Sequence, residues 1–285
     1  MTRRSEIAFA GAGAGAVLLA LTWLLALHVG IFERADQAIL AGFVDLHAHR
    51  GVDRVAAAIA HLCNPNPYVF LAAVPVTVAL LRRRARALMA IGAILLGANV
   101  TTQLLKPMLA QPRADQLIHG LVYINPASWP SGHATAAMSL ALCCVLAAPP
   151  RLRPAVACLG AAFAVAVSYS FLTLAWHYPS DVFGGFLVAG TWTMLAIAVV
   201  FRTDVRRARQ GEGADSSTRL SVGDALAPQA ALVLGIGVLA GLVALVRPHA
   251  VFGYARAHEV FVVGAGAIGL LALAVASAIT LAMRR

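Results

Sequence analysis

The sequence has 285 residues, of which 60% are hydrophobic and only 12% are charged. Soluble globular domains use about 25% charged residues, so this composition excludes a soluble globular protein. The formal net charge is +10, but the arginines stand in short clusters between apolar blocks. Such clusters are typical of loops that orient membrane spans rather than of nucleic-acid-binding surfaces. The sequence therefore predicts an all-α, polytopic helical membrane protein with no nucleic-acid partner.

Eight apolar blocks follow one another along the chain, and most are long enough to cross a hydrocarbon core about 30 Å thick. They span residues 7–29, 67–81, 87–106, 131–148, 154–176, 180–201, 228–246 and 259–283. The first block follows Arg3 and Arg4 as a signal peptide would, but it is longer than a signal core and lacks a clear small-x-small cleavage site. We therefore expect about eight transmembrane helices, the first of them uncleaved.

Residues 30–66, between the first two blocks, are mixed in polarity. Phe32, Ile39 and Phe43 stand among charged residues such as Asp36. This spacing is typical of amphipathic helices, so we predict one or two helices that lie at the membrane interface in this segment.

The distribution of cations predicts the orientation of the spans, because Lys and Arg are retained on the cytoplasmic side. With the N-terminus inside, fifteen arginines fall in cytoplasmic segments, and seven Lys and Arg residues fall on the outer side. We therefore expect a multi-pass protein of the cell membrane with both termini cytoplasmic. The polar stretch 203–227 is typical of a flexible linker. It would separate a six-span domain at 1–202, including the interfacial helices, from a two-span appendage at 228–285.

Polar side chains at the predicted outer ends of the spans form three clusters, and ionisable groups at such positions are candidates for function. The first cluster is Lys106, the only lysine of the chain, with Arg113 seven residues later. A lysine at a helix end can simply anchor the helix at the interface. The use of a single lysine among so many arginines favours a functional role.

The second cluster is Pro-Ser-Gly-His at residues 130–133, at the start of the fourth block. Pro followed by Ser favours a helix start, where unpaired N–H groups and the helix dipole can bind an anion. Gly132 would let a phosphate oxygen approach the backbone beside Ser131, and His133 could give or take a proton. The alternative is a capped helix with an incidental histidine.

The third cluster is His-Tyr-Pro-Ser-Asp at residues 177–181, between the fifth and sixth blocks. Pro179 favours a helix start, which would place Asp181 in the first turn. Its carboxylate could accept from one imidazole nitrogen of His177 and leave the other nitrogen free as a nucleophile. The alternative is an interfacial histidine with Asp181 as a helix cap.

The predicted topology brings the three clusters to the same face of the membrane. Two histidines with a lysine and an arginine can transfer a phosphoryl group without a metal, because cations stabilise the charge while one histidine attacks and the other protonates the leaving oxygen. No acidic cluster offers a two-metal site. We therefore expect no metal and no cofactor.

The chain resembles the type-2 phosphatidic acid phosphatase superfamily of integral membrane lipid phosphatases. Its motifs are Lys, six residues, Arg-Pro; then Pro-Ser-Gly-His; then Ser-Arg, five residues, His, three residues, Asp. The residues that keep these identities and spacings, within about 67–201, are Lys106, Arg113, Pro130, Ser131, Gly132, His133, Ser170, His177 and Asp181.

The resemblance implies catalytic roles for His177 as the residue that forms a phosphohistidine, Asp181 as its orienter and His133 as general acid. It implies that the phosphate is held by four further residues, Lys106, Arg113, Ser131 and Gly132.

Two positions depart from the motifs. Ala114 replaces the proline after Arg113, and Phe171 replaces the arginine after Ser170. Losing one charge-assisted donor typically costs about 1.5–3 kcal/mol, which corresponds to roughly ten- to a hundredfold in binding or rate.

The function expected from these residues is metal-independent hydrolysis of a membrane lipid phosphate or pyrophosphate, of the polyprenyl pyrophosphate or phosphatidate type, at the outer face of the membrane. One alternative is a phosphotransferase of the same fold, in which an alcohol rather than water accepts the phosphoryl group. Another is a non-catalytic lipid-binding protein, which would have no need of a nucleophile and its orienter. The sequence leaves the lipid, the acceptor, the role of the last two spans and the oligomeric state open.

Overall fold

The computed structural model describes residues 3–47, 51–113, 124–208 and 221–283. Over these residues the chain forms eleven α-helices and two short 3-10 turns, and it contains no strand. The helices are α1 (Arg3–His28), α2 (Gly30–His47), α3 (Val52–His61), α4 (Pro65–Leu81), α5 (Ala85–Met108), α6 (Gly132–Ala147), α7 (Arg153–Thr173), α8 (Pro179–Ala208), α9 (Val222–Val246), α10 (Pro248–Ala257) and α11 (Glu259–Ala282). The predicted all-α architecture is confirmed.

Seven helices of the described ranges are long and apolar enough to cross a membrane. The number rises to eight if α3 and α4, which are bent by 57° at the break between them, form one broken span. This agrees with the expectation of about eight spans. The second predicted block corresponds to α4, which has only 17 residues, so it would cross the membrane together with α3.

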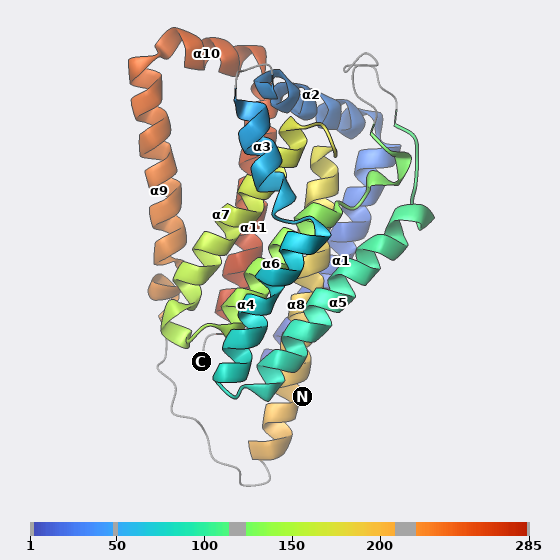
Figure 1. The fold of residues 1–285 in the computed structure, drawn as a ribbon, viewed down its shortest axis with the longest axis vertical. Coiled ribbons are helices and arrows are strands. Elements are labelled where there is room, and N and C mark those ends of the chain that lie inside the picture. The colour runs from blue at the N-terminus through green and yellow to red at the C-terminus, as the bar shows by residue number, and fades with distance from the viewer. Residues whose placement is uncertain (1–2, 48–50, 114–123, 209–220, 284–285) are drawn as a thin grey trace.

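Two helices lie across one end of the bundle. Figure 1 shows α2 and α10 at this end and both chain termini toward the other end. Helices α2 and α3 lie within residues 30–66, where the sequence predicts one or two helices at the membrane interface. Helix α3 packs against α7 and leads into the bent pair with α4.

Helix α6 forms the centre of the bundle. It packs against α4, α5, α7 and α8, and nearly all its residues from Ala134 to Ala147 are buried. Many of these residues are alanines, and small side chains let neighbouring helices approach closely without a hydrophobic driving force between them. This close packing places the start of α6 next to the first turn of α8.

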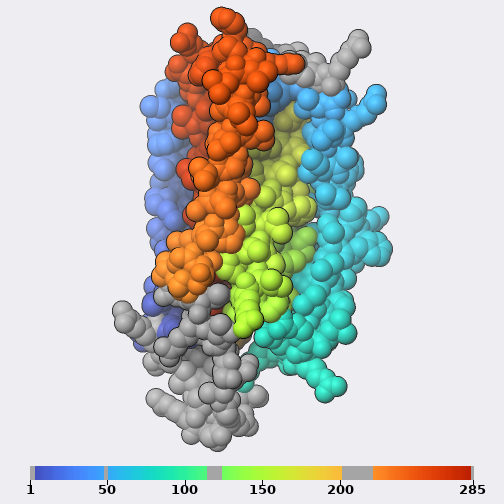
Figure 2. Space-filling view, turned by 90° about the vertical axis from the view of Figure 1, so that its left-hand side faces the viewer, coloured from blue at the N-terminus to red at the C-terminus, as the bar shows by residue number. Residues whose placement is uncertain are grey.

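The two spans predicted to form an appendage differ in their packing. Helix α9 stands on the outside of the molecule beside α7 (Figure 2), whereas α11 packs against α2, α7 and α8. Gly264 of α11 explains part of this close fit, because an added Cβ would lie 2.5 Å from Ile39 of α2. Helix α11 is thus part of the central bundle, and only α9 and α10 are peripheral.

Candidate active site

The start of α6 is tied directly to the first turn of α8. Ser131 is the N-cap of α6, and its hydroxyl accepts from the backbone N–H of Ala134 at 3.3 Å. The backbone N–H of Ser131 donates to the carbonyl oxygen of Asp181 at 2.9 Å. The helix start predicted from Pro-Ser is confirmed, and the backbone hydrogen bond brings the second and third sequence clusters together.

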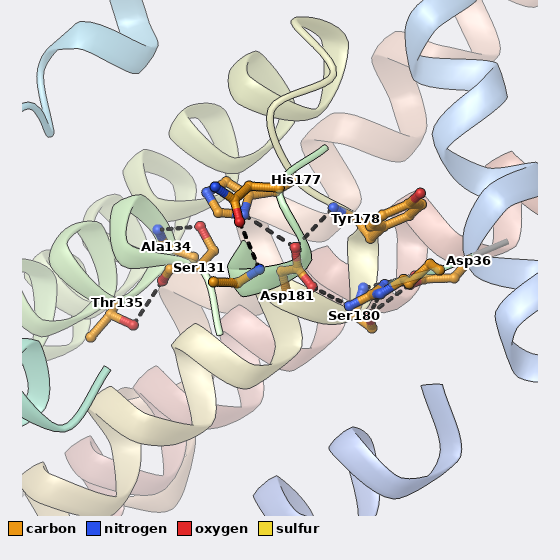
Figure 3. Close-up of polar contacts among 11 residues, drawn as sticks. Asp36, Ser131, Ala134, Thr135, His177, Tyr178, Ser180 and Asp181 are labelled. Carbon is orange, nitrogen blue, oxygen red and sulfur yellow. Dashed lines mark hydrogen bonds and ion pairs between the residues drawn. The ribbon is translucent and has the colours of Figure 1, made fainter. Parts of the chain in front are cut away.

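Asp181 and His177 form the pair expected from the third cluster. Helix α8 begins at Pro179, with Asp181 in its first turn. One carboxylate oxygen of Asp181, Oδ2, lies 3.1 Å from Nδ1 of His177 and also accepts from the backbone N–H of Tyr178 (Figure 3). Because an ionised carboxylate can only accept, Nδ1 donates in this bond, and in the neutral imidazole Nε2 is then the nitrogen that can act as a nucleophile.

The second histidine faces the first. The ring centroids of His133 and His177 are 6.4 Å apart. Nε2 of His133 lies 2.8 Å from the side-chain oxygen of Asn64, the N-cap residue of α4. Sequence reasoning did not find Asn64, and its only signal was the Asn-Pro pair that begins α4. The break between α3 and α4 thus supplies a partner that fixes the His133 ring.

Lys106 reaches the start of α6 from the end of α5. A Cβ built on Gly132 would lie 3.7 Å from Nζ of Lys106 and 3.7 Å from the side-chain nitrogen of Gln103. The ammonium group therefore stands beside the first turn of α6, where the N–H groups of Gly132 and His133 have no intrahelical acceptor. This juxtaposition supplies positive charge and donors at one point, as an anion requires.

Arg113, which the resemblance implies as a phosphate ligand, forms ion pairs with two carboxylates. Its Nη1 lies 2.6 Å from Oδ2 of Asp36, and its Nη2 lies 2.6 Å from Oδ1 of Asp181. Burial raises the pKa of Asp36 to about 6, although Arg113 opposes this rise. The pKa of Arg113 is raised, because the attraction of Asp181 and Asp36 outweighs the effect of its own burial. Asp36 belongs to α2, and its place within a segment predicted to be interfacial gave no signal of this contact.

Phe171 lies against the two histidines. Its ring is fully buried, with its centroid 5.3 Å from the ring of His177 and 6.0 Å from that of His133. Trp176 continues this aromatic wall, 5.6 Å from His133. The position at which the resembled motif has an arginine is therefore apolar, and it supplies no donor to a phosphate. Among the residues that the structure describes, no group of three or more His, Cys, Asp or Glu side chains could hold a metal ion.

A family model and a solved structure match this chain. The family model of the PAP2 superfamily matches residues 87–204, which run from α5 to α8 and include His133, His177 and Asp181. The fold is similar to that in the crystal structure of the first transmembrane PAP2 type phosphatidylglycerolphosphate phosphatase from Bacillus subtilis. The TM-score is 0.54 and the sequence identity is 22%, and the match covers 69% of this chain and 98% of the other. A search of curated proteins found no significant match. The chain is therefore a multi-pass helical protein with the fold of a transmembrane PAP2 type phosphatase.

Gly185 is the point at which α8 approaches the start of α6 most tightly. A Cβ at this position would lie 2.8 Å from both the Ala134 Cβ and the Ser131 carbonyl oxygen. We expect Gly185→Ala to push the two helices apart and to destabilise the protein by about 1–3 kcal/mol. Thermal unfolding in detergent measures this effect. Gly266→Ala on α11 is the matched control, since an added Cβ there has no neighbour within 4 Å. Equal unfolding temperatures for the two variants would contradict the expected clash.

Proposed function

We propose that this protein hydrolyses a lipid phosphate or pyrophosphate through a phosphohistidine, without a metal ion. The supporting observation is the pairing of two facing histidines with one buried carboxylate, Asp181, on Nδ1 of His177. Neither a residue that only caps a helix nor a lysine that only anchors a helix end would require two facing histidines and a buried carboxylate. The match to the PAP2 superfamily and the likeness to a phosphatidylglycerolphosphate phosphatase support a phosphatase activity.

In the proposed first step, Nε2 of His177 attacks the phosphorus atom and the bond between phosphorus and the lipid oxygen breaks. Asp181 holds the imidazole and balances the positive charge that develops on it. His133 donates a proton to the leaving lipid oxygen. The phosphate oxygens are held by Lys106 and by the first turn of α6, where Ser131 fixes the helix start and Gly132 leaves room for them.

In the second step, a water molecule gives a proton to His133 and attacks the phosphohistidine. The bond between phosphorus and nitrogen breaks, inorganic phosphate leaves, and both histidines return to their initial states. An alcohol in place of water would give the phosphotransferase alternative. The aromatic wall of Phe171 and Trp176 leaves Lys106 to supply most of the positive charge to the phosphate, so we expect weaker binding than in a site with an additional arginine.

Phosphate release by the purified protein in detergent tests this proposal. The substrates are phosphatidate, phosphatidylglycerolphosphate and a polyprenyl pyrophosphate, each assayed with EDTA and with added Mg²⁺. We expect turnover of at least one substrate at equal rates in both conditions. Added glycerol distinguishes the acceptors, because a phosphotransferase would form glycerol phosphate instead of inorganic phosphate. Turnover that requires Mg²⁺, or no turnover at all, would contradict the proposed function.

The proposed domain organisation is a six-span catalytic unit at 1–202, a cytoplasmic linker at 203–227 and two further spans at 228–285. The boundary between the first two falls within α8, which ends at Ala208. Helix α11 packs against α2, α7 and α8. The last span would therefore stabilise the catalytic unit although it lies outside residues 1–202.

We further propose that the site faces away from the cytoplasm and that both termini are cytoplasmic. The basic turn at Arg151 would then be cytoplasmic, and α10 with His249 would be outside. Single cysteines at these two positions, in a protein without its four native cysteines, test the orientation. In intact cells, an impermeant thiol reagent should label His249→Cys, whereas Arg151→Cys should react only after the membrane is opened. The reverse pattern would place the site in the cytoplasmic leaflet.

A further inference from the structure

Arg113 is almost fully enclosed by protein groups. Its side chain is 5% exposed, and its guanidinium donates from Nη1 to Asp36 and to the hydroxyl of Ser180, and from Nη2 to Asp181. The ring of Tyr178 covers its face at 4.2 Å. One positive charge therefore stands between two carboxylates, and both N–H groups of Nη1 and one of Nη2 donate to protein groups.

Asp36 is itself held in a fixed position. Its Oδ1 accepts from the backbone N–H of Ser180 at 2.8 Å, and its Oδ2 accepts from the Ser180 hydroxyl at 2.6 Å (Figure 3). These hydrogen bonds satisfy a donor at the first turn of α8 with a side chain from α2. The interfacial helix α2 is thus bound to the same turn that carries Asp181.

Hydrogen bonds link Arg113 to His177 through the carboxylate of Asp181. Arg113 binds Oδ1 of Asp181, whereas His177 binds the other oxygen, Oδ2, through Nδ1. In the proposed mechanism the other ring nitrogen, Nε2, attacks phosphorus, so Arg113 is linked to the nucleophile through the carboxylate of Asp181.

We propose that Asp36 and Arg113 are positioning residues, which act through Asp181 on His177. This inference rests on the proposed function. A buried carboxylate that accepts from two sides has a fixed orientation, so the imidazole that it holds is fixed as well. Asp36 in turn fixes the guanidinium through the ion pair with Nη1.

Asp36→Asn is the most informative variant. An asparagine can still accept from the backbone N–H of Ser180, but it removes the ion pair with Arg113. The remaining pair of Arg113 and Asp181 is electrically balanced, so we expect the variant to fold. We expect kcat to fall about tenfold, because Asp181 loses its fixed orientation, while the inhibition constant of inorganic phosphate stays within about twofold of the wild-type value. Asp45→Asn is the matched control, since it makes the same change on an exposed residue of α2.

Two further variants separate positioning from binding. Lys106→Ala should weaken inhibition by phosphate at least about tenfold. Arg113→Gln should lower kcat, and the double variant with Asp36→Asn should have no lower kcat than Arg113→Gln alone, because both changes interrupt one chain of contacts. If Arg113→Gln does not fold, because two buried carboxylates lose their cation, Asp36→Asn alone decides.

The wild-type protein is assayed first, so that the two proposals can fail separately. Absence of metal-independent turnover would refute the proposed function, whatever the variants do. With turnover present, tighter inhibition by phosphate in Asp36→Asn would overturn the inference, because it would show that Asp36 competes with phosphate for Arg113. An unchanged kcat in Asp36→Asn would also overturn it.

Discussion

Replacement of His177 by alanine is expected to lower kcat/KM by about 10⁴-fold or more, because it removes the imidazole that attacks phosphorus in the proposed mechanism. The imidazole of His177 is held by Asp181, whose Oδ2 lies 3.1 Å from Nδ1, and in the proposed mechanism the other nitrogen, Nε2, attacks phosphorus. Without the ring, Lys106 and the start of α6 could still bind the phosphate. We therefore expect binding of inorganic phosphate to persist while turnover is lost.

Covalent trapping tests the same role independently of the rate. Wild-type protein mixed with a substrate labelled at phosphorus and quenched in alkali should retain the label, and acid should release it, as expected of a phosphohistidine. His177→Ala should retain none. The control is His249→Ala, which removes an exposed histidine. His249 belongs to α10, a helix that contacts α9 and α11. Label retained by His177→Ala would show that another residue is the nucleophile.

Replacement of His133 by alanine is expected to have an effect that depends on the leaving group. A lipid alcohol leaves poorly without a proton, so its hydrolysis should slow by about 10²–10⁴-fold when the general acid is removed. An aryl phosphate such as p-nitrophenyl phosphate has a leaving group that needs little protonation. Formation of its phosphohistidine should slow far less, because His177 and Asp181 are intact.

Single-turnover measurements on both substrates separate the first step from the second. His133 also takes the proton from water in the proposed second step, so the labelled intermediate should accumulate in His133→Ala with the aryl substrate. The neighbouring Trp176→Phe, which keeps an aromatic ring 5.6 Å from the imidazole position, is the control for changed packing. Equal losses on the two substrates would contradict the assignment of His133 as general acid, although not the existence of the site.

The sequence alone predicted the features that depend on local chemistry. Blocks of apolar residues indicated the helices, since no other unit satisfies the backbone of a single segment within a bilayer. Pro-Ser and Pro179 marked the starts of α6 and α8, because a fixed φ and a capping hydroxyl favour a helix start wherever the chain lies. The spacing of His177 and Asp181 predicted their contact, because residues four apart meet at a helix start.

The tertiary structure alone decided which distant groups complete the site. Asp36 contacts Ser180 from 144 residues away, and Asn64 contacts His133 from 69 residues away. An acidic residue on an amphipathic helix has the same sequence pattern whether it faces the headgroups or a buried arginine. The direction that it faces is fixed by the rotation of α2 against α8 and α11, which depends on close contacts such as that between Gly264 and Ile39. Periodicity defines an apolar face, but only packing between helices determines which polar groups are enclosed with it.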